Sequence, residues 1–208
     1  MSRIVLASGS PRRKELLEQI GLEFEICPAK GEEIITSSNP SDVVLELSKQ
    51  KAEEVASMVV GYNDSHQDVT TPGDILVIGA DTVVAYDGKI LGKPADKEKA
   101  VEMLEMLQGK THQVFTGVTV VFISEDGRTG EKSFFEETKV NMCKMSPEEI
   151  HRYVESGEPM DKAGAYAIQG RCAIHIAYIE GDYHNVVGLP VSRLYQELLS
   201  LGIDLLVW

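Results

Sequence analysis

The stretch IVLASGSPRRKELL, residues 4–17, decides the fold class of this sequence. Its first four residues are apolar or small and predict a short buried strand, and residues 8–11 predict a tight turn. Ser10 suits the N-cap of a helix, and Pro11 suits its first position. A strand that turns directly into a helix is typical of α/β proteins.

Strand and helix signals continue to alternate along the rest of the chain. This alternation favours an α/β layout without a linker between separate domains, so we expect one domain over residues 1–208. Further strands are expected at 75–80, 83–86, 90–91, 111–123, 131–145 and 172–179. Further helices are expected at 41–60, 96–107, 146–157 and 191–201. Asp96 is expected to cap the second of these, and Ser146-Pro147-Glu148-Glu149 predicts a capping box at the start of the third. Residues 61–74 are polar and rich in breakers and predict an exposed loop, and residues 160–170 predict a second loop of small residues.

Composition excludes several classes of partner. The net charge is −13, whereas binding to long DNA or RNA usually needs a basic excess, so a nucleic-acid polymer is not expected as a partner. No apolar run reaches the roughly 20 residues that span a bilayer, so no membrane is expected either. The cysteines Cys27, Cys143 and Cys172 are odd in number and form no CxxC pair. They are expected to be reduced thiols in a cytoplasmic protein.

Three cations, Arg12-Arg13-Lys14, crowd the first turn of the first predicted helix. The helix dipole is positive there and favours carboxylates, so the arrangement is locally unfavourable. It is explained if an anion binds at this turn, held by backbone N–H groups, by the Ser8 and Ser10 hydroxyls and by the guanidinium groups. A solvated basic turn is the alternative.

Two further positions break local rules. Lys51 lies on the apolar stripe of the helix predicted at 41–60, where it must either extend its ammonium to the surface or point into a polar site. Asp81 and Thr82 interrupt an apolar strand signal, and a carboxylate there needs a partner, a cation or a proton to handle. A purely structural aspartate that caps a turn is the alternative for Asp81.

The loop at 160–170, MDKAGAYAIQG, combines glycines and small residues that permit a ligand to approach the backbone closely. Within it, the Gln169 amide offers a donor and an acceptor that together can read a nucleobase edge. Asp161 and Lys162 have a simpler explanation, since they can pair with each other.

Other patterns resemble known sites only superficially. Gly109-Lys110-Thr111 resembles the end of a phosphate-binding P-loop, but Leu104 stands where the first glycine is required and the triplet follows a helix. The five histidines show no metal-ligand spacing, and Ser10 lacks the GxSxG context of a serine hydrolase.

Seven blocks of the sequence, in order along nearly the whole chain, resemble the motifs of the Maf-like proteins. The blocks are LASGSPRR (6–13) with ELL (15–17), KA (51–52), GADTVV (79–84), LGKP (91–94), HQVFTGV (112–118), DKAGAYAIQG (161–170) and NVVGLP (185–190). The resemblance implies a two-lobed α/β fold with a mixed sheet, flanking helices and a central cleft, similar to the inosine-triphosphate pyrophosphatases. It also implies that the active site lies in the cleft, and it implies a homodimer.

The same resemblance implies an enzyme that splits nucleoside triphosphates into a monophosphate and pyrophosphate with a divalent cation, Mg²⁺ or Mn²⁺. The ending Ile168-Gln169-Gly170, together with Arg12 and Thr82, resembles the branch that acts on dTTP and UTP. The family is understood to remove surplus or non-standard nucleotides, after an early association with the inhibition of septum formation.

Carried onto this chain, the resemblance gives each candidate residue a role. Asp81, Lys51 and Lys93 are expected to be catalytic, and Glu33 with Asp81 is expected to hold the metal through hard oxygen ligands. The residues expected to bind the substrate are Ser8, Ser10, Arg12, Arg13, Thr82 and Gln169. Among these, Arg13 would neutralise the phosphates, whereas Arg12, Thr82 and Gln169 would select the base.

Two other functions stay open at the level of sequence. One is a pyrophosphatase tuned to modified nucleotides, because branches of this fold share most of the phosphate machinery. The other is a nucleotide-binding regulator of cell division without significant catalysis. Both the regulator and the enzyme are expected to bind nucleotides, but only the enzyme is expected to release pyrophosphate in a metal-dependent reaction.

Overall fold

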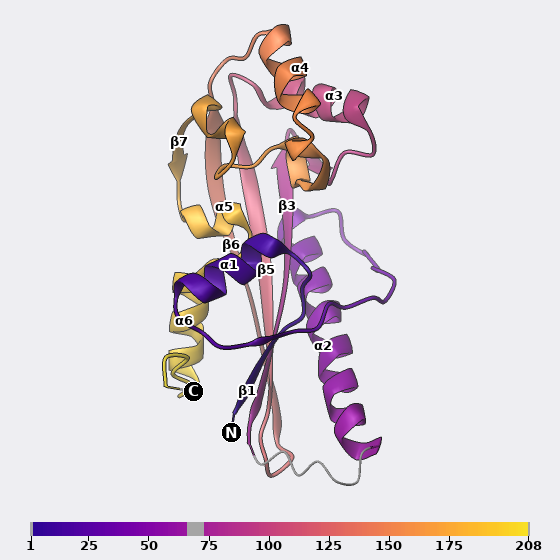
Figure 1. Cartoon of the computed structure of the whole chain (residues 1–208), viewed down its shortest axis with the longest axis vertical. Coiled ribbons are helices and arrows are strands. Elements are labelled where there is room, and N and C mark those ends of the chain that lie inside the picture. The colour runs from indigo at the N-terminus through magenta and orange to yellow at the C-terminus, as the bar shows by residue number, and fades with distance from the viewer. Residues whose placement is uncertain (1, 66–72, 208) are drawn as a thin grey trace. The chain divides into compact units, whose positions relative to one another are not determined.

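The computed structural model describes residues 2–65 and 73–207 (Figure 1). Its strands are β1 (Arg3–Leu6), β2 (Glu25–Ile26), β3 (Ile75–Tyr86), β4 (Lys89–Leu91), β5 (Thr111–Ile123), β6 (Thr129–Met142) and β7 (Ile176–Glu180). Its helices are α1 (Pro11–Gln19), α2 (Pro40–Ser65), α3 (Lys97–Leu107), α4 (Pro147–Glu155), α5 (Tyr183–Val187) and α6 (Val191–Ser200). Short 3-10 helices are η1 (Glu158–Asp161), η2 (Ala163–Ala165) and η3 (Arg171–His175).

Across the described residues, seven strands form one sheet in the order β2-β1-β3-β5-β6-β7, and β4 pairs with β3. β1 runs parallel to both of its neighbours, whereas the β3–β4 and β6–β7 pairs are antiparallel. The sheet is therefore mixed, and with its flanking helices it confirms the α/β class that the sequence predicts.

The described chain divides into two compact units. The first falls within Met1–Asp81, Gly117–Phe135 and Gly188–Trp208, and the second comprises Thr82–Thr116 and Glu136–Val187. The boundary lies inside β3, so Asp81 and Thr82 are the last and first residues of different units. The cleft that the family resemblance implies stays a prediction.

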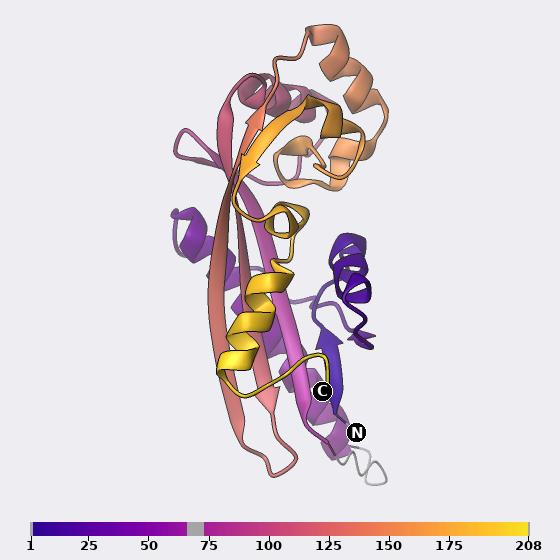
Figure 2. The same cartoon turned by 90° about the vertical axis from the view of Figure 1, so that its left-hand side faces the viewer.

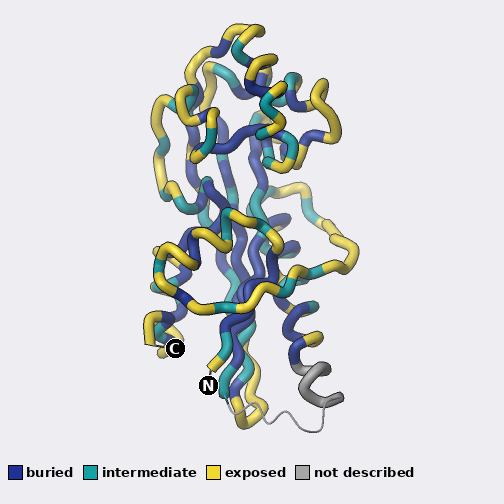
Figure 3. Tube along the Cα trace, in the orientation of Figure 1, coloured by how far each residue is buried: buried dark blue, intermediate teal, exposed yellow. Residues whose placement is uncertain are grey.

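In the first unit, α2 covers one face of the sheet. Successive side chains of a strand point to opposite faces, and the odd-numbered Val5 and Val77 belong to one buried cluster. Val55 and Val59 of α2 complete that cluster. Figure 3 shows the buried strands behind the exposed segment that joins β1 to α2. Burial of these apolar side chains is what fixes α2 against the sheet.

The opposite face of the same unit carries α6, as Figures 1 and 2 show. Lys132 on β6 forms an ion pair with Glu197 on α6, with 2.9 Å between Nζ and Oε2. The guanidinium of Arg193 lies over the Phe134 ring, 5.8 Å from its centroid. Ser133, which lies between them on β6, is 2.9 Å from the Thr119 hydroxyl, and Thr119 contacts Ser48 of α2. Ser133 therefore faces α2, so its even-numbered neighbours Lys132 and Phe134 face α6.

Two glycines allow α2 to lie directly on the strands. A Cβ at Gly79 on β3 would stand 2.3 Å from the Ser48 carbonyl oxygen, and one at Gly117 on β5 would stand 2.2 Å from the Val44 carbonyl oxygen. Such distances are far below van der Waals contact. Only glycine at these two positions lets the helix backbone come this close.

The second unit packs α3 against α4 and η2. The Ser146 capping box predicted at the start of α4 is present, because Glu149 N donates to Ser146 Oγ and Ser146 N donates to Glu149 Oε2. The Asp96 cap of α3 is confirmed as well, with its carboxylate accepting from Lys99 N at 2.7 Å.

Several predicted boundaries are wrong. The helix expected at 41–60 continues as α2 to Ser65, so residues 61–65 are not loop, and residues 66–72 lie outside the described residues. The strand expected at 172–179 begins only at Ile176, because the preceding segment is the 3-10 helix η3. There, Ala173 N bonds to Gly170 O at 3.0 Å and closes a turn.

Two further features of the described residues concern hydropathy and the cysteines. In the described parts of the chain, 2–65 and 73–207, no helix combines the length and the apolar character that crossing a membrane requires. The three cysteines are free thiols, with Cys172 buried. Burial raises the pKa of Cys172 to about 12, so this thiol is unreactive at neutral pH.

Candidate active site

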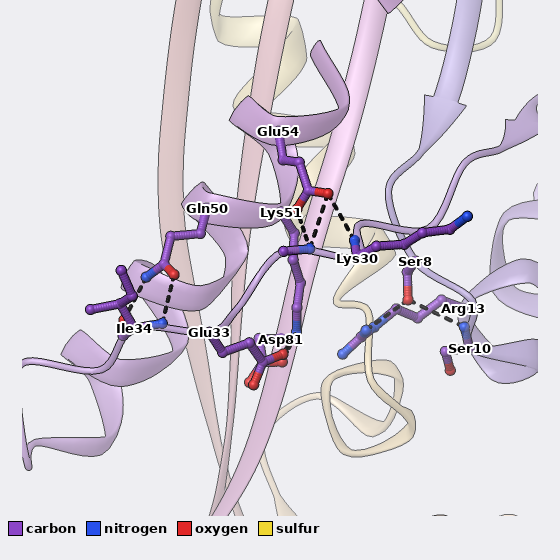
Figure 4. Close-up of polar contacts among 11 residues, drawn as sticks. Ser8, Ser10, Arg13, Lys30, Glu33, Ile34, Gln50, Lys51, Glu54 and Asp81 are labelled. Carbon is purple, nitrogen blue, oxygen red and sulfur yellow. Dashed lines mark hydrogen bonds and ion pairs between the residues drawn. The ribbon is translucent and has the colours of Figure 1, made fainter. Parts of the chain in front are cut away.

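Two carboxylates from separate segments converge on one ammonium group. Lys51 Nζ, on α2, donates to Asp81 Oδ1 on β3 and stands 2.9 Å from Glu33 Oε1 in the loop before α2. Figure 4 shows the three side chains pointing toward one another. The Lys51 and Asp81 side chains keep only 19% and 16% of their exposure, whereas Glu33 keeps 53%.

The placement of this cluster follows from the fold. Asp81 is odd-numbered on β3, so its side chain points to the face that α2 covers. The position of Lys51 follows from the register of α2. Lys51 directly precedes Ala52, and Ala52 packs onto Gly79 of β3. Lys51 therefore serves an ion-pair cluster instead of extending to the surface, and Asp81 has the cationic partner that its position required.

The loop that carries Glu33 is tied to α2 by a row of polar side chains. Glu46, Gln50 and Glu54 are spaced four residues apart and so share one side of the helix. The Glu54 carboxylate accepts from Lys30 N at 2.8 Å and from Gly31 N at 3.0 Å (Figure 4).

Gln50 and Glu46 extend the same row along the loop. Gln50 accepts from Ile34 N at 2.9 Å and donates to Ile34 O at 2.6 Å, which fixes both polar backbone groups next to Glu33. Glu46 accepts from Thr36 N at 2.9 Å. The loop backbone is thereby held in place although its residues are largely exposed.

Arg13 on α1 donates hydrogen bonds to the turn that follows β1 and to the segment that precedes α6. Its NH1 donates to Ser8 Oγ at 2.9 Å, and its Nε donates to Gly188 O at 2.8 Å. Ser8 Oγ also accepts from Ser10 N at 3.3 Å, so one hydroxyl joins the turn to the helix (Figure 4). Removal of the guanidinium from water lowers the pKa of Arg13, and the negative charge of Asp81 opposes this shift.

The remaining residues of this turn are placed as the sequence predicts. Ser10 is the N-cap residue of α1 and Pro11 opens the helix, while the backbone of Ser10 uses Ser8 as its acceptor. Arg12 is half-buried on α1. Lys14 turns away along the helix to Glu18, with 3.4 Å between Nζ and Oε1, which makes it a surface pair.

Thr82 opens the second unit and lies in a network of buried polar groups. Its hydroxyl is 2.9 Å from the hydroxyl of Thr116 on β5, which donates to Asn185 O at 2.9 Å. Asn185 Nδ2 donates to Val114 O at 3.0 Å and to Thr138 Oγ1 at 2.9 Å. These bonds fix the position of the Thr82 hydroxyl.

Lys93 and Gln169 lie in two loops of the second unit, and both are exposed. Gly164 N donates to Gly92 O at 3.1 Å, so the loop that contains Lys93 is bonded to the segment that leads to Gln169. Asp161 and Lys162 in that segment form an ion pair with each other, as the simpler interpretation of the sequence held.

The structure thus gathers the predicted site residues in two sets. The first unit holds Ser8, Ser10, Arg12, Arg13, Glu33, Lys51 and Asp81, and the second holds Thr82, Lys93 and Gln169. That both sets serve one substrate stays a prediction. Sequence reasoning missed Glu46, Gln50, Glu54 and Thr116. The four-residue spacing of the three α2 side chains was the available signal, but nothing in the sequence said which loop they hold.

Glu33 and Asp81 offer the hard oxygen atoms that Mg²⁺ or Mn²⁺ prefers. Among the described residues, no group of three or more histidine, cysteine or carboxylate side chains is arranged to hold a metal by itself. Magnesium is commonly bound through one or two carboxylates together with substrate phosphates. Glu33 and Asp81 fit that manner of binding, in which the substrate would supply the remaining ligands of the metal.

Among the solved structures that match this chain, two of low similarity are the following. A HAM1 protein from Coxiella burnetii is 17% identical with a TM-score of 0.42, over 96% of this chain and 100% of that one. A nucleoside-triphosphatase (dITP/XTP pyrophosphatase) from Mycobacterium abscessus is 14% identical with a TM-score of 0.31, over 70% and 76% of the two chains.

Comparison with known sequences gives much closer relatives. The dTTP/UTP pyrophosphatase of Agathobacter rectalis is 69% identical over 204 residues, which cover 98% of this chain and 100% of the relative. The proteins of the same name from Lachnoclostridium phytofermentans and Bacillus anthracis are 50% and 48% identical, each over at least 98% of both chains. The family model described as Maf-like protein matches residues 3–201. The chain therefore belongs to the Maf-like protein family.

Proposed function

We propose that this protein is a nucleotide pyrophosphatase that hydrolyses dTTP and UTP to the nucleoside monophosphate and pyrophosphate. The observation that carries the proposal is the 69% identity, over nearly the whole of both chains, with a protein named dTTP/UTP pyrophosphatase. The Lys51–Asp81–Glu33 cluster and the Arg13–Ser8 contact support it, because they supply cations and carboxylates of the kind that hydrolysis of a phosphoric anhydride needs.

In the proposed reaction, water attacks the α-phosphorus and pyrophosphate leaves. Such chemistry depends mainly on positioning and on neutralisation of charge. Asp81 orients the water or accepts its proton, and the ion pair with Lys51 holds the carboxylate in position for that role. Arg13, Lys51 and Lys93 neutralise the triphosphate, and Ser8 and Ser10 hydrogen-bond to it.

Glu33 and Asp81 are the residues we propose to hold Mg²⁺ or Mn²⁺. When bound, this cation withdraws charge from the phosphate oxygens that it contacts. Base selection is assigned to Arg12, Thr82 and Gln169. Support for Thr82 comes from its hydrogen bond to Thr116, which fixes the hydroxyl, and support for Gln169 comes from its exposure on the turn between Ile168 and Gly170.

The cellular setting is proposed on the family resemblance. The protein would act in the cytoplasm, where nucleoside triphosphates are made and used, and would remove surplus or unwanted ones. It would do so as a homodimer, which light scattering coupled to size exclusion measures directly.

A nucleotide panel tests the proposed function. Purified protein is incubated with dTTP, UTP, CTP, GTP, ITP and 7-methyl-GTP, with and without Mg²⁺ or Mn²⁺, and the nucleotide product is identified. We expect metal-dependent conversion of dTTP and UTP to their monophosphates. Turnover of ITP or 7-methyl-GTP alone would keep the reaction and reject the assigned bases. Binding of nucleotide without any turnover would favour the regulator.

Asp81→Asn is the matched control for chemistry in the same assay. It keeps the size and most of the hydrogen bonding of the side chain but removes its charge. Turnover should fall by about 10²–10⁴-fold, the range that a general base contributes, while the thermal unfolding curve stays cooperative. Full activity in this variant would reject Asp81 as the catalytic carboxylate.

A further inference from the structure

A tyrosine and a glutamate outside the family-derived site hold the turn that presents Gln169. Tyr153 on α4 is 5% exposed, and its hydroxyl donates to Glu158 Oε1 at 2.9 Å. The same hydroxyl accepts from Ala167 N at 3.1 Å. The Glu158 carboxylate accepts from Arg171 N with both oxygens, at 2.9 and 3.1 Å.

These contacts bracket Gln169 symmetrically along the chain. The amide two residues before it is held by the tyrosine, and the amide two residues after it is held by the glutamate. Because the two holding side chains bond to each other, they act as one clamp rather than two anchors. A clamp of this kind fixes the backbone on both sides of an exposed side chain, which limits where that side chain can reach.

The glycine next to Gln169 shows how tightly the clamp fits. A Cβ at Gly170 would lie 2.3 Å from Glu158 Oε1. The carboxylate therefore lies directly against the backbone at Gly170, and the turn has no space for a side chain there. Gly170 N also donates to Ala167 O at 3.2 Å, which closes the turn between the two held amides.

The surroundings keep the clamp intact. The neighbouring Ala167, Ile168 and Cys172 are buried, so water cannot easily replace the bond between Ala167 N and the Tyr153 hydroxyl, whereas the Glu158 bonds to Arg171 N lie nearer the surface. Burial also raises the pKa of Tyr153, so its hydroxyl stays protonated and continues to donate to Glu158 at neutral pH. Gln169 is exposed on this turn, and Arg171 is exposed beside it.

We propose that Tyr153 and Glu158 are positioning residues for base selection, which hold the turn so that the Gln169 amide meets the nucleobase in one orientation. The proposal deepens the proposed function and rests on its assignment of Gln169. Neither residue is expected to contact the phosphates. Loss of the clamp should therefore change which base is preferred more than it changes how triphosphates in general are bound.

The test measures base selectivity by binding, so that it does not depend on turnover. Dissociation constants for the α,β-imido analogues of dTTP and dCTP are measured by calorimetry on the full-length protein. The selectivity ratio is the dissociation constant of the dCTP analogue divided by that of the dTTP analogue. The variants are Tyr153→Phe, Glu158→Gln and Gln169→Ala. Glu149→Gln is the matched control, because it weakens the capping box of the same helix without touching the turn. The ratio is insensitive to the folded fraction, since both ligands report on the same sample.

We expect Tyr153→Phe and Glu158→Gln to lower the selectivity ratio roughly tenfold, in the direction of Gln169→Ala, while Glu149→Gln leaves the ratio unchanged. Hydrogen exchange should speed up at the amides of Ala167 and Arg171 in the two clamp variants and not in the control. A selectivity shift in Gln169→Ala without one in either clamp variant would overturn the inference.

Two further outcomes separate this inference from the proposed function. An unchanged ratio in Gln169→Ala would overturn the inference together with the base-reading role of Gln169. If the wild-type protein releases no pyrophosphate but the clamp variants and Gln169→Ala still shift binding selectivity, the proposed reaction fails and the clamp stands.

Discussion

Lys51 on α2 and Asp81 on β3 form a largely buried ion pair, and Glu33 joins it from the loop before α2. One ammonium thus serves two carboxylates. The two ways of breaking the cluster should therefore change the free energy of unfolding by different amounts. Removal of the Lys51 cation leaves two negative charges side by side, whereas removal of the Asp81 charge leaves Lys51 paired with Glu33.

Lys51→Met is therefore expected to lower the free energy of unfolding more than Asp81→Asn does. The loss should be roughly 3 kcal/mol for Lys51→Met, the lower end of the cost of removing one partner of a buried pair. Chemical denaturation of both single variants and of the double variant measures this. The double variant should be more stable than the sum of the single losses predicts. Equal losses in the single variants, with strict additivity, would argue against a shared cluster.

The close contact of α2 with the sheet predicts a steric effect at Gly79. Gly79→Ala places a Cβ against the Ser48 carbonyl and should cost roughly 1–3 kcal/mol of stability, as overpacking does. Because α2 carries Lys51, activity should fall in the folded fraction too. Gly130→Ala is the control, since nothing lies within 4 Å of its added Cβ. Thermal unfolding and turnover of both variants check this, and similar behaviour of the two would refute the close contact.

The loop contacts predict which residues govern metal dependence. Glu33→Gln should raise the Mg²⁺ concentration needed for half-maximal turnover, and chelation should stop turnover in the wild type. Gln50→Ala removes the two hydrogen bonds that hold the Ile34 backbone next to Glu33. It should raise the Mg²⁺ concentration for half-maximal turnover roughly tenfold, as loss of a residue that supports a metal ligand does. Turnover measured against metal concentration tests the two variants and the chelated wild type, with Glu32→Gln as the neighbouring control. A Glu32→Gln shift as large as that of Glu33→Gln would reject the assignment.

His112 predicts a pH dependence of stability. Burial lowers the pKa of His112 to about 4 from its usual 6.5, because the charged ring loses its water. Between these values the unfolded chain binds a proton that the folded protein does not, so stability falls as pH falls from 6.5 toward 4, by roughly 3 kcal/mol in total. In His112→Gln this contribution should vanish, and the stability of the variant should fall less steeply over the same range. Parallel pH profiles of the two proteins would contradict it.

Much of the fold is predictable from the sequence because its local signals agree. The strand, turn and helix of residues 4–17, the Asp96 cap and the Ser146 capping box all appear where the sequence places them. The failures arise where side chains from elsewhere decide the backbone. The strand expected from Cys172 begins late because the Glu158 carboxylate holds Arg171 N and bends the chain into η3.

The candidate site shows the same division. Broken local rules identify Lys51 and Asp81 from sequence alone, since a cation on an apolar helix face and an acid within an apolar strand each need a partner. The sequence cannot say that they are each other's partner, because 30 residues separate them and only the packing of α2 on β3 brings them together. Tyr153 and Glu158 break no local rule, so their contacts on either side of Gln169 are visible only in the structure.

Hydrolysis of dTTP in ¹⁸O-labelled water shows which phosphorus the water attacks, with the products resolved by mass spectrometry and with chelated and Asp81→Asn samples as controls. We expect dTMP that carries one ¹⁸O and unlabelled pyrophosphate, formed only with metal and formed far more slowly by Asp81→Asn than by the wild-type protein. Formation of dTDP and phosphate, or label in the pyrophosphate, would contradict water attack at the α-phosphorus.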